Sequence, residues 1–188
     1  MGKFTRHLVA LAVLALAAPL ASATVLTFDD LGSDGLVPSH YGGLDWSASS
    51  WFNFGDEQAP FAAHSGEYRA TLGWDGTAST SAVSFLTAST FGGAWFAGFD
   101  GVSVAFDLYY QGHQVASSGT LNTSGTSSFL ASGYGGLVDR ITIRSNDHAN
   151  FVMDDFTFSA PVPEPGTTAL MFAGLGLVAW AARRRFHA

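Results

Sequence analysis

VSVAFDLYY, residues 102–110, carries the clearest structural signal in this chain of 188 residues. Val102, Val104, Phe106 and Leu108 alternate with small or polar residues. Successive side chains of a β-strand point to opposite faces of a sheet, so a period of two predicts a strand with one buried face. The segment therefore favours a β fold.

Further strand signals flank this segment, in short runs separated by Gly, Asn and Ser, and no window of the central part of the chain has helical periodicity. The additional runs are 24–29, 44–54, 68–72, 81–86, 114–117, 127–131, 137–144 and 150–159. The turn Gln111-Gly112-His113 is expected to join 102–110 to 114–117 as a hairpin. Short strands at this spacing predict an all-β domain, a two-sheet antiparallel β-sandwich of jelly-roll type.

The C-terminus combines three features in order. The motif VPEP consists of Val162, Pro163, Glu164 and Pro165; an apolar stretch runs from Thr167 to Ala182; and Arg183, Arg184 and Arg185 follow it. The stretch is 16 residues long, slightly short of the ~20 that a transmembrane helix prefers. Arginines directly after it resist translocation and hold the C-terminus in the cytoplasm. We therefore expect a single C-terminal transmembrane helix, with everything before Pro163 outside.

This tail closely resembles the PEP-CTERM sorting signal of Gram-negative bacteria, which consists of a Pro-Glu-Pro motif, one hydrophobic helix and a terminal basic cluster. The resemblance implies recognition by exosortase, a multi-spanning membrane enzyme similar to a cysteine transpeptidase, which cleaves near the motif and releases or attaches the protein outside the cell. The two prolines keep the motif extended and open to a protease-like cleft. The alternative is an ordinary C-terminal anchor with a proline-containing linker.

The N-terminus has the features of a secretory signal peptide. Lys3, Arg6 and His7 form a short basic region, Leu8 to Leu20 an apolar core, and Ala21-Ser22-Ala23 a small-residue cleavage site. Cleavage after Ala23 would start the mature protein at Thr24; the alternative is an uncleaved anchor. The expected organisation is a signal peptide at 1–23, a β-sandwich ectodomain at 24–160 and a sorting signal at 161–188.

The ectodomain sequence is strongly acidic. Residues 24–160 contain fourteen Asp and Glu but only three basic residues, Arg69, Arg140 and Arg144, which gives a net charge of about −11 with His neutral. Such a surface repels nucleic acid and anionic lipid, and it favours divalent cations. The chain has no cysteine, so disulfides cannot stabilise the exported domain.

A second resemblance covers most of the ectodomain. Thr27-Phe28-Asp29-Asp30-Leu31, Val37-Pro38, Tyr41-Gly42-Gly43-Leu44-Asp45-Trp46 and Met153-Asp154-Asp155-Phe156 are the segments that carry it. They resemble the opening and closing strands of a family of secreted bacterial and fungal β-sandwich domains. Those sandwiches are similar to carbohydrate-binding modules, which implies carbohydrate binding only by analogy.

The two Asp-Asp pairs suggest a metal site. First and last strands of a jelly roll are commonly neighbours, which would bring Asp29 and Asp30 near Asp154 and Asp155. Gathered carboxylates repel one another unless a cation intervenes, and Ca²⁺ prefers such oxygen ligands. Adjacent strand residues point to opposite faces, so only one acid of each pair is expected to face inward. The alternative is that these acids cap turns or face solvent at an edge.

Other candidate chemistry is sparse. His40, His64, His113 and His148 show no zinc-binding spacing, and no Gly-X-Ser-X-Gly elbow is present. Acid pairs for glycoside hydrolysis, such as Asp56 or Glu57 with Glu67, occur in any acid-rich domain. Among Trp46, Trp51, Trp74 and Trp95, which could stack on sugars, Trp74 is the best ligand candidate because Gly73-Trp74-Asp75-Gly76 predicts a loop tip.

Three functions follow from these features. The leading hypothesis is a non-enzymatic protein, exported across the inner membrane, transiently anchored there, and then processed by an exosortase-type membrane transpeptidase. It would act at the cell surface or outside the cell in an exopolysaccharide matrix or biofilm. The alternatives are a calcium-dependent carbohydrate-binding module and a glycosidase or lyase. Nucleic acid is not an expected partner.

Overall fold

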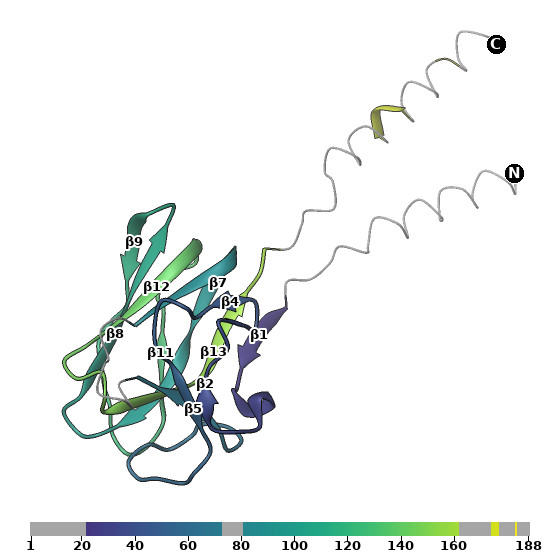
Figure 1. The fold of residues 1–188 in the computed structure, drawn as a ribbon. Helices are drawn as coiled ribbons and strands as arrows, with labels where there is room; N and C mark the ends of the chain where they lie inside the picture. Colours follow the sequence, from purple (N-terminus) through teal and green to yellow (C-terminus); the bar gives the residue numbers. More distant parts are fainter. Residues whose placement is uncertain (1–21, 73–80, 162–173, 177–182, 184–188) are drawn as a thin grey trace, which may run out of the picture. The chain divides into compact units, whose positions relative to one another are not determined.

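The computed structural model describes residues 22–72, 81–161, 174–176 and 183 (Figure 1). Ser22–Pro161 form one unit with its own hydrophobic core, which we call the ectodomain. Every strand pair among these residues is antiparallel. Most of the predicted transmembrane stretch lies outside the described residues, and no helix within them is long and apolar enough to cross a membrane.

The described part of the ectodomain consists of strands and one short 3-10 helix. They are β1 (Ala23–Leu26), η1 (Asp29–Leu31), β2 (Gly35–Leu36), β3 (His40–Tyr41), β4 (Leu44–Asp45), β5 (Phe52–Phe54), β6 (Arg69–Thr71), β7 (Ala82–Gly98), β8 (Ser103–Tyr110), β9 (His113–Ser117), β10 (Leu121–Asn122), β11 (Ser128–Ala131), β12 (Leu137–Ser145) and β13 (Phe151–Ser159). The predicted all-β antiparallel class is therefore confirmed.

The hairpin predicted from the alternating segment is present. Strands β8 and β9 pair antiparallel, with Tyr110 opposite His113. The two residues between them, Gln111 and Gly112, have φ angles of 52° and 78°. Positive φ at both central positions is the geometry that matches the twist of a two-residue hairpin. Figure 1 shows this hairpin at one end of the ectodomain.

Three predicted strands have other boundaries. The first ends at Leu26 because Phe28 adopts a φ of 63° and η1 follows. The run 44–54 is divided into β4 and β5, and the run beginning at residue 81 continues as the 17-residue strand β7. The prediction missed residues 87–98 because Gly92 and Gly93 interrupt the apolar pattern in their middle.

Strand β7 connects the two halves of the fold. Its first half pairs with β12 and β4, and its second half pairs with β13 and β11. The register of β13 against β7 shifts on both sides of Thr157, which is paired with Gly93, and that of β12 shifts between Val138 and Arg140. Bulges and glycines bend strands, so these irregularities allow the sheet to fold back on itself.

Aromatic rings fill the space enclosed by this bend. Phe91 of β7 lies 4.8 Å from Phe106 of β8 and 4.7 Å from Phe156 of β13, measured between ring centroids. β12 separates β8 from β7 in the sheet order, yet Phe106 and Phe91 are in contact. The described strands thus form one continuous sheet folded into two facing layers, in place of the two separate sheets expected from the sequence. The jelly-roll connectivity itself stays a prediction.

A second group of packed aromatic rings accounts for the motif Tyr41-Gly42-Gly43-Leu44-Asp45-Trp46. Gly42 and Gly43, with φ of 61° and 81°, form the turn between β3 and β4. The hairpin directs Tyr41 and Trp46 onto Phe28, with centroid distances of 5.7 Å in both cases. Trp46 also contacts Trp51 and Phe156, so the N-terminal segment is packed against the last strand.

We predict that Gly93→Ala destabilises the ectodomain by about 2 to 3 kcal/mol. Gly93 has a φ of 142°, and a Cβ there would collide with the carbonyl oxygen of Leu130. Gly119→Ala is the matched control, because nothing lies within 4 Å of its added Cβ. Urea unfolding of residues 22–161 measures both changes. Equal stability of the two variants would contradict the role of Gly93 in the bend.

Candidate functional site

Both Asp-Asp pairs contact one surface segment, residues 56–68, which connects β5 to β6 and which we call the strap. The predicted neighbourhood of the first and last strands is confirmed, since β1 pairs with β13 and Leu26 lies opposite Phe156. Asp29 and Asp30 follow β1 in η1, whereas Asp154 and Asp155 lie within β13. Each pair therefore contacts the strap from a different element, through Asp29 in η1 and through Asp154 and Asp155 in β13.

Asp154 and Asp155 hold the middle of the strap. Asp154 Oδ2 accepts hydrogen bonds from the backbone N–H groups of His64 at 2.7 Å and Ser65 at 3.0 Å. Asp155 Oδ1 accepts one from the Ser65 hydroxyl at 2.7 Å, and its Oδ2 lies 2.5 Å from His64 Nδ1. The two carboxylates thus satisfy donors in a loop that has no strand partner.

Asp29 holds the following turn. Its Oδ1 accepts hydrogen bonds from the N–H groups of Glu67 at 2.8 Å and Tyr68 at 2.9 Å. A Cβ at Gly66, whose φ is 56°, would collide with the Asp29 carboxylate, so glycine permits this close approach. Asp30 has a different partner, the hydroxyl of Tyr41, at 2.5 Å. Three of the four predicted acids therefore act on the strap.

The expectation that adjacent acids point to opposite faces is wrong for Asp154 and Asp155. Asp155 has a φ of 45° and lies in the region where the register between β13 and β7 shifts. This bulge interrupts the alternation of the strand, so both carboxylates contact the strap. Their residues are only 1% and 8% exposed, respectively.

Two of these acids have net pKa shifts in opposite directions. Burial raises the pKa of Asp154 to about 6, although hydrogen bonds from the backbone of Ser65, His64 and Asp155 act in the other direction. Burial also raises the pKa of Asp29, but the N–H groups of Tyr68 and Glu67 outweigh it and the net pKa is lowered. Asp154 is thus the carboxyl group whose charge is costly at neutral pH.

The shared calcium site stays a prediction. Among the described residues, no group of three or more His, Asp or Glu side chains is arranged to hold a metal ion. The carboxylate oxygens that would coordinate calcium instead accept the hydrogen bonds given above. Such hydrogen bonds correspond to the alternative to calcium binding, in which the acids cap turns.

Arg69 is a buried cation that contacts the strap, and its role could not be predicted from the sequence. Its residue is 2% exposed, and its guanidinium carbon lies 4.0 Å from the centroid of the Phe54 ring. The guanidinium donates to the backbone carbonyls of Glu67 at 3.1 Å and Asp56 at 2.5 Å. Arg69 therefore anchors both ends of the strap, opposite the carboxylates that hold its middle.

An aromatic surface formed by His64, Trp95 and Phe129 borders the strap. The imidazole of His64 stacks on the indole of Trp95, with ring centroids 3.4 Å apart and planes 12° from parallel. Trp95 lies opposite Phe129 on β11, with centroids 5.6 Å apart, and Phe129 is 44% exposed. Flat rings at this exposure are suited to stacking on a sugar.

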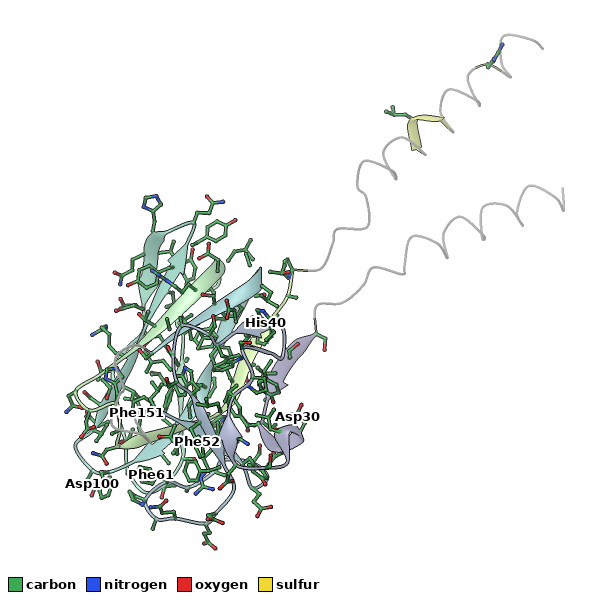
Figure 2. The ribbon with its side chains drawn as sticks, viewed as in Figure 1. Asp30, His40, Phe52, Phe61, Asp100 and Phe151 are labelled. Carbon is green, nitrogen blue, oxygen red and sulfur yellow. The ribbon has the colours of Figure 1, made fainter. Side chains whose placement is uncertain are left out.

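A second aromatic pair joins the strap to the end of β7. Phe61 packs against Phe99, which follows β7, with centroids 5.5 Å apart. Figure 2 labels Phe61 and Asp100 near each other at one end of the ectodomain. A cavity of about 540 Å³ lies beside this pair and is lined by strap residues, including Phe61 and Glu67.

The described tryptophans fall into two groups, one in the core and one at the surface. Trp46 and Trp51 are each 1% exposed and belong to the core, whereas Trp95 is half-buried at the surface. Trp74, the ligand residue predicted from the sequence, lies outside the described residues. So do Ala21 and the motif from Val162 to Pro165, while Ala23 begins β1.

Comparisons with known proteins identify the C-terminal segment. Residues 161–185 match the family model described as the PEP-CTERM protein-sorting motif, so the chain carries this sorting motif. A search of curated proteins found no match. Among solved structures, a mutant of CBM29-2, a family 29 carbohydrate-binding module, is similar at 14% identity; the alignment covers 74% of this chain and 92% of that one, with a TM-score of 0.41.

We predict that Asp154 makes the stability of the ectodomain fall between about pH 4 and pH 6. Its folded-state pKa of about 6 lies above the ordinary 3.8, so its favourable contribution is complete below 3.8 and is lost as pH rises through 6. Relative to Asp154→Ala, the wild type should lose up to about 3 kcal/mol of unfolding free energy between pH 4 and pH 7.

Urea unfolding of both proteins at several pH values gives this difference directly. Asp100→Ala, which removes an exposed acid, controls for the general effect of deleting one carboxylate. A wild-type advantage over Asp154→Ala that stays constant from pH 4 to pH 7 would contradict the shifted pKa.

Proposed function

We propose that this protein is exported, processed by an exosortase-type membrane transpeptidase, and then acts without catalysis at the cell surface or in the surrounding exopolysaccharide matrix. The observation that carries the proposal is the PEP-CTERM sorting motif at residues 161–185. The signal-peptide pattern at residues 1–23 supports the same route, because it supplies the export step that such a motif requires.

The arrangement of the ectodomain is compatible with processing at both ends. Ala23 and Ser159 are paired at the end of the β1–β13 ladder. Signal cleavage after Ala23 would remove only this terminal pair, because Thr24, Val25 and Leu26 keep their partners on β13. The buried core starts at Leu26 and ends at Phe158, so both cleavage regions lie outside it.

The non-enzymatic role is supported by the positions of the acids. A carboxyl general acid needs a raised pKa and access to substrate. Asp154 has the raised pKa, but it is 1% exposed and bonded to the strap. Asp56, Glu57 and Glu67, the pairs considered for glycoside hydrolysis, are exposed on the strap. Asp154 therefore lacks the access to substrate that a general acid needs.

A second candidate function is carbohydrate binding, favoured by the aromatic surface of His64, Trp95 and Phe129. Asp155 of β13 fixes the His64 ring, so the stacked rings are held before a ligand arrives. Such preorganisation reduces the entropy lost on binding. A calcium requirement would be an additional property, because the stacked rings themselves supply no carboxylate ligand for calcium.

We predict that the triple variant Pro163→Ala, Glu164→Ala, Pro165→Ala remains in the inner membrane with its C-terminal tail intact. The change removes the extended motif that the sorting enzyme reads. Cell fractionation with antibodies against the tail and the ectodomain measures this. The wild-type chain in cells lacking exosortase is the control and should behave as the variant does. Normal processing of the triple variant would contradict the sorting proposal.

For the carbohydrate-binding candidate, Phe129→Ala should weaken binding to exopolysaccharide from the producing cells by about two- to tenfold, the range expected for one aromatic contact. Its exposure means that the fold should keep its melting temperature. Leu137→Ala, which truncates an apolar residue that is 37% exposed on β12, is the matched control. Affinity electrophoresis compares the three proteins, and indistinguishable mobilities in the polysaccharide gel would exclude Phe129 as a contact.

A further inference from the structure

A cavity of about 710 Å³ lies over strands β8 and β12, away from the strap. Figure 1 shows the two strands side by side. The polar residues that line the cavity include Ser103, Thr120, Arg140, Thr142 and Arg144. None of its lining residues belongs to the aromatic surface or to the cavity beside Phe61. We call it the β8–β12 cavity.

The accessible positive charge of the ectodomain is concentrated in this cavity. Residues 24–160 contain three arginines and no lysine, against fourteen acids. Arg69 is buried under the strap, so Arg140 and Arg144 are the exposed cations of the segment. They lie on the same face of β12, four residues apart, which corresponds to about 13 Å along a strand.

The two arginines have different surroundings. Arg144 Nε lies 2.7 Å from Asp107 Oδ2, and the other oxygen of Asp107 accepts a hydrogen bond from the Ser117 hydroxyl at 2.6 Å. Arg144 is therefore fixed and partly neutralised. The guanidinium carbon of Arg140 lies 4.4 Å from the centroid of the Tyr109 ring. Within residues 22–72 and 81–161, no carboxylate forms an ion pair with Arg140.

This combination matches the chemistry of an anionic sugar. A guanidinium placed over an aromatic ring and free of an ion pair can offer its forked donors to a carboxylate or a sulfate. The hydroxyl groups of Ser103, Thr120 and Thr142 line the same cavity and are suited to sugar hydroxyls. Val104 and Ala105 supply apolar lining. Sugar binding sites in general combine these polar and apolar contacts.

The acidic surface around the cavity favours a polysaccharide of low charge density over nucleic acid. At physiological ionic strength, charges more than about 8 Å apart are largely screened, so distant acids do not prevent a contact ion pair in the cavity. Double-stranded nucleic acid carries one charge per ~1.7 Å and would meet the surrounding acids as well. A polysaccharide with at most a few anionic groups in the contact region avoids that repulsion.

We infer that the β8–β12 cavity binds the anionic groups of an acidic polysaccharide, with Arg140 as the principal contact and Arg144 as a second. The inference names a ligand class for the interaction role proposed above and rests on that role for its biological context. It requires neither the aromatic surface nor calcium.

Binding of the full chain, purified in mild detergent, to alginate, dextran sulfate and neutral dextran tests the inference by calorimetry at low and physiological salt. Alginate carries carboxylates and dextran sulfate carries sulfates, so the two arms distinguish the anionic group. We expect binding to at least one anionic polymer, none to dextran, and a loss of about tenfold for Arg140→Gln. Arg140→Lys should recover only part of the affinity, because lysine lacks the planar fork.

Gln58→Glu is the matched control, since it makes the chain one charge more negative on the exposed strap, outside the β8–β12 cavity. It should leave affinity within about twofold of wild type, because screening weakens distant charges. Absence of binding to both anionic polymers would overturn the inference, as would equal losses for Gln58→Glu and Arg140→Gln. Either result would leave the sorting proposal unaffected, because sorting is measured by processing in cells.

Discussion

The bend of strand β7 at Gly92 and Gly93 is the constraint on which the rest of the ectodomain depends. One strand contributes pairing partners to both halves of the sheet, so the two layers cannot form independently of each other. The bend also brings Phe91 against Phe106 and Phe156, the contacts that close the core. The chain has no cysteine, so no disulfide links the two layers. The shared strand links them instead, as disulfides do in many small exported domains.

The bend also separates the surfaces available for interaction. The second half of β7 carries Trp95, next to the strap that Asp154 and Asp155 hold in place. The β8–β12 cavity, with Arg140, lies on strands that join the first half of β7. An acidic domain with one aromatic surface and one cationic cavity has two ways to contact a polysaccharide, and neither involves a reactive group. This arrangement agrees with the interaction role proposed above.

The sequence predicted what depends on local pattern. The alternation of apolar and polar residues located β8 and its hairpin with β9. The pairing of β1 with β13 was expected because the first and last strands of a jelly roll are commonly neighbours. The length of β7 could not be predicted, because the need for glycine comes from residues on other strands, Thr157 beside Gly92 and Leu130 beside Gly93. The partners of the acids could not be located for the same reason: they lie in the strap, 38 to 91 residues away in the sequence. Arg69 gave no signal, since its buried position depends on the strap fold.

The central claim is that the functional protein is the ectodomain released from both targeting segments. Mass spectrometry of the intact protein from its producing cells tests this most directly, because it determines both termini and any covalent adduct in one mass. The account predicts a chain that begins at Thr24 and ends near the Pro-Glu-Pro motif, without the apolar stretch and the three arginines. A mature protein that retains Arg183 to Arg185, or that begins at Met1, would contradict it.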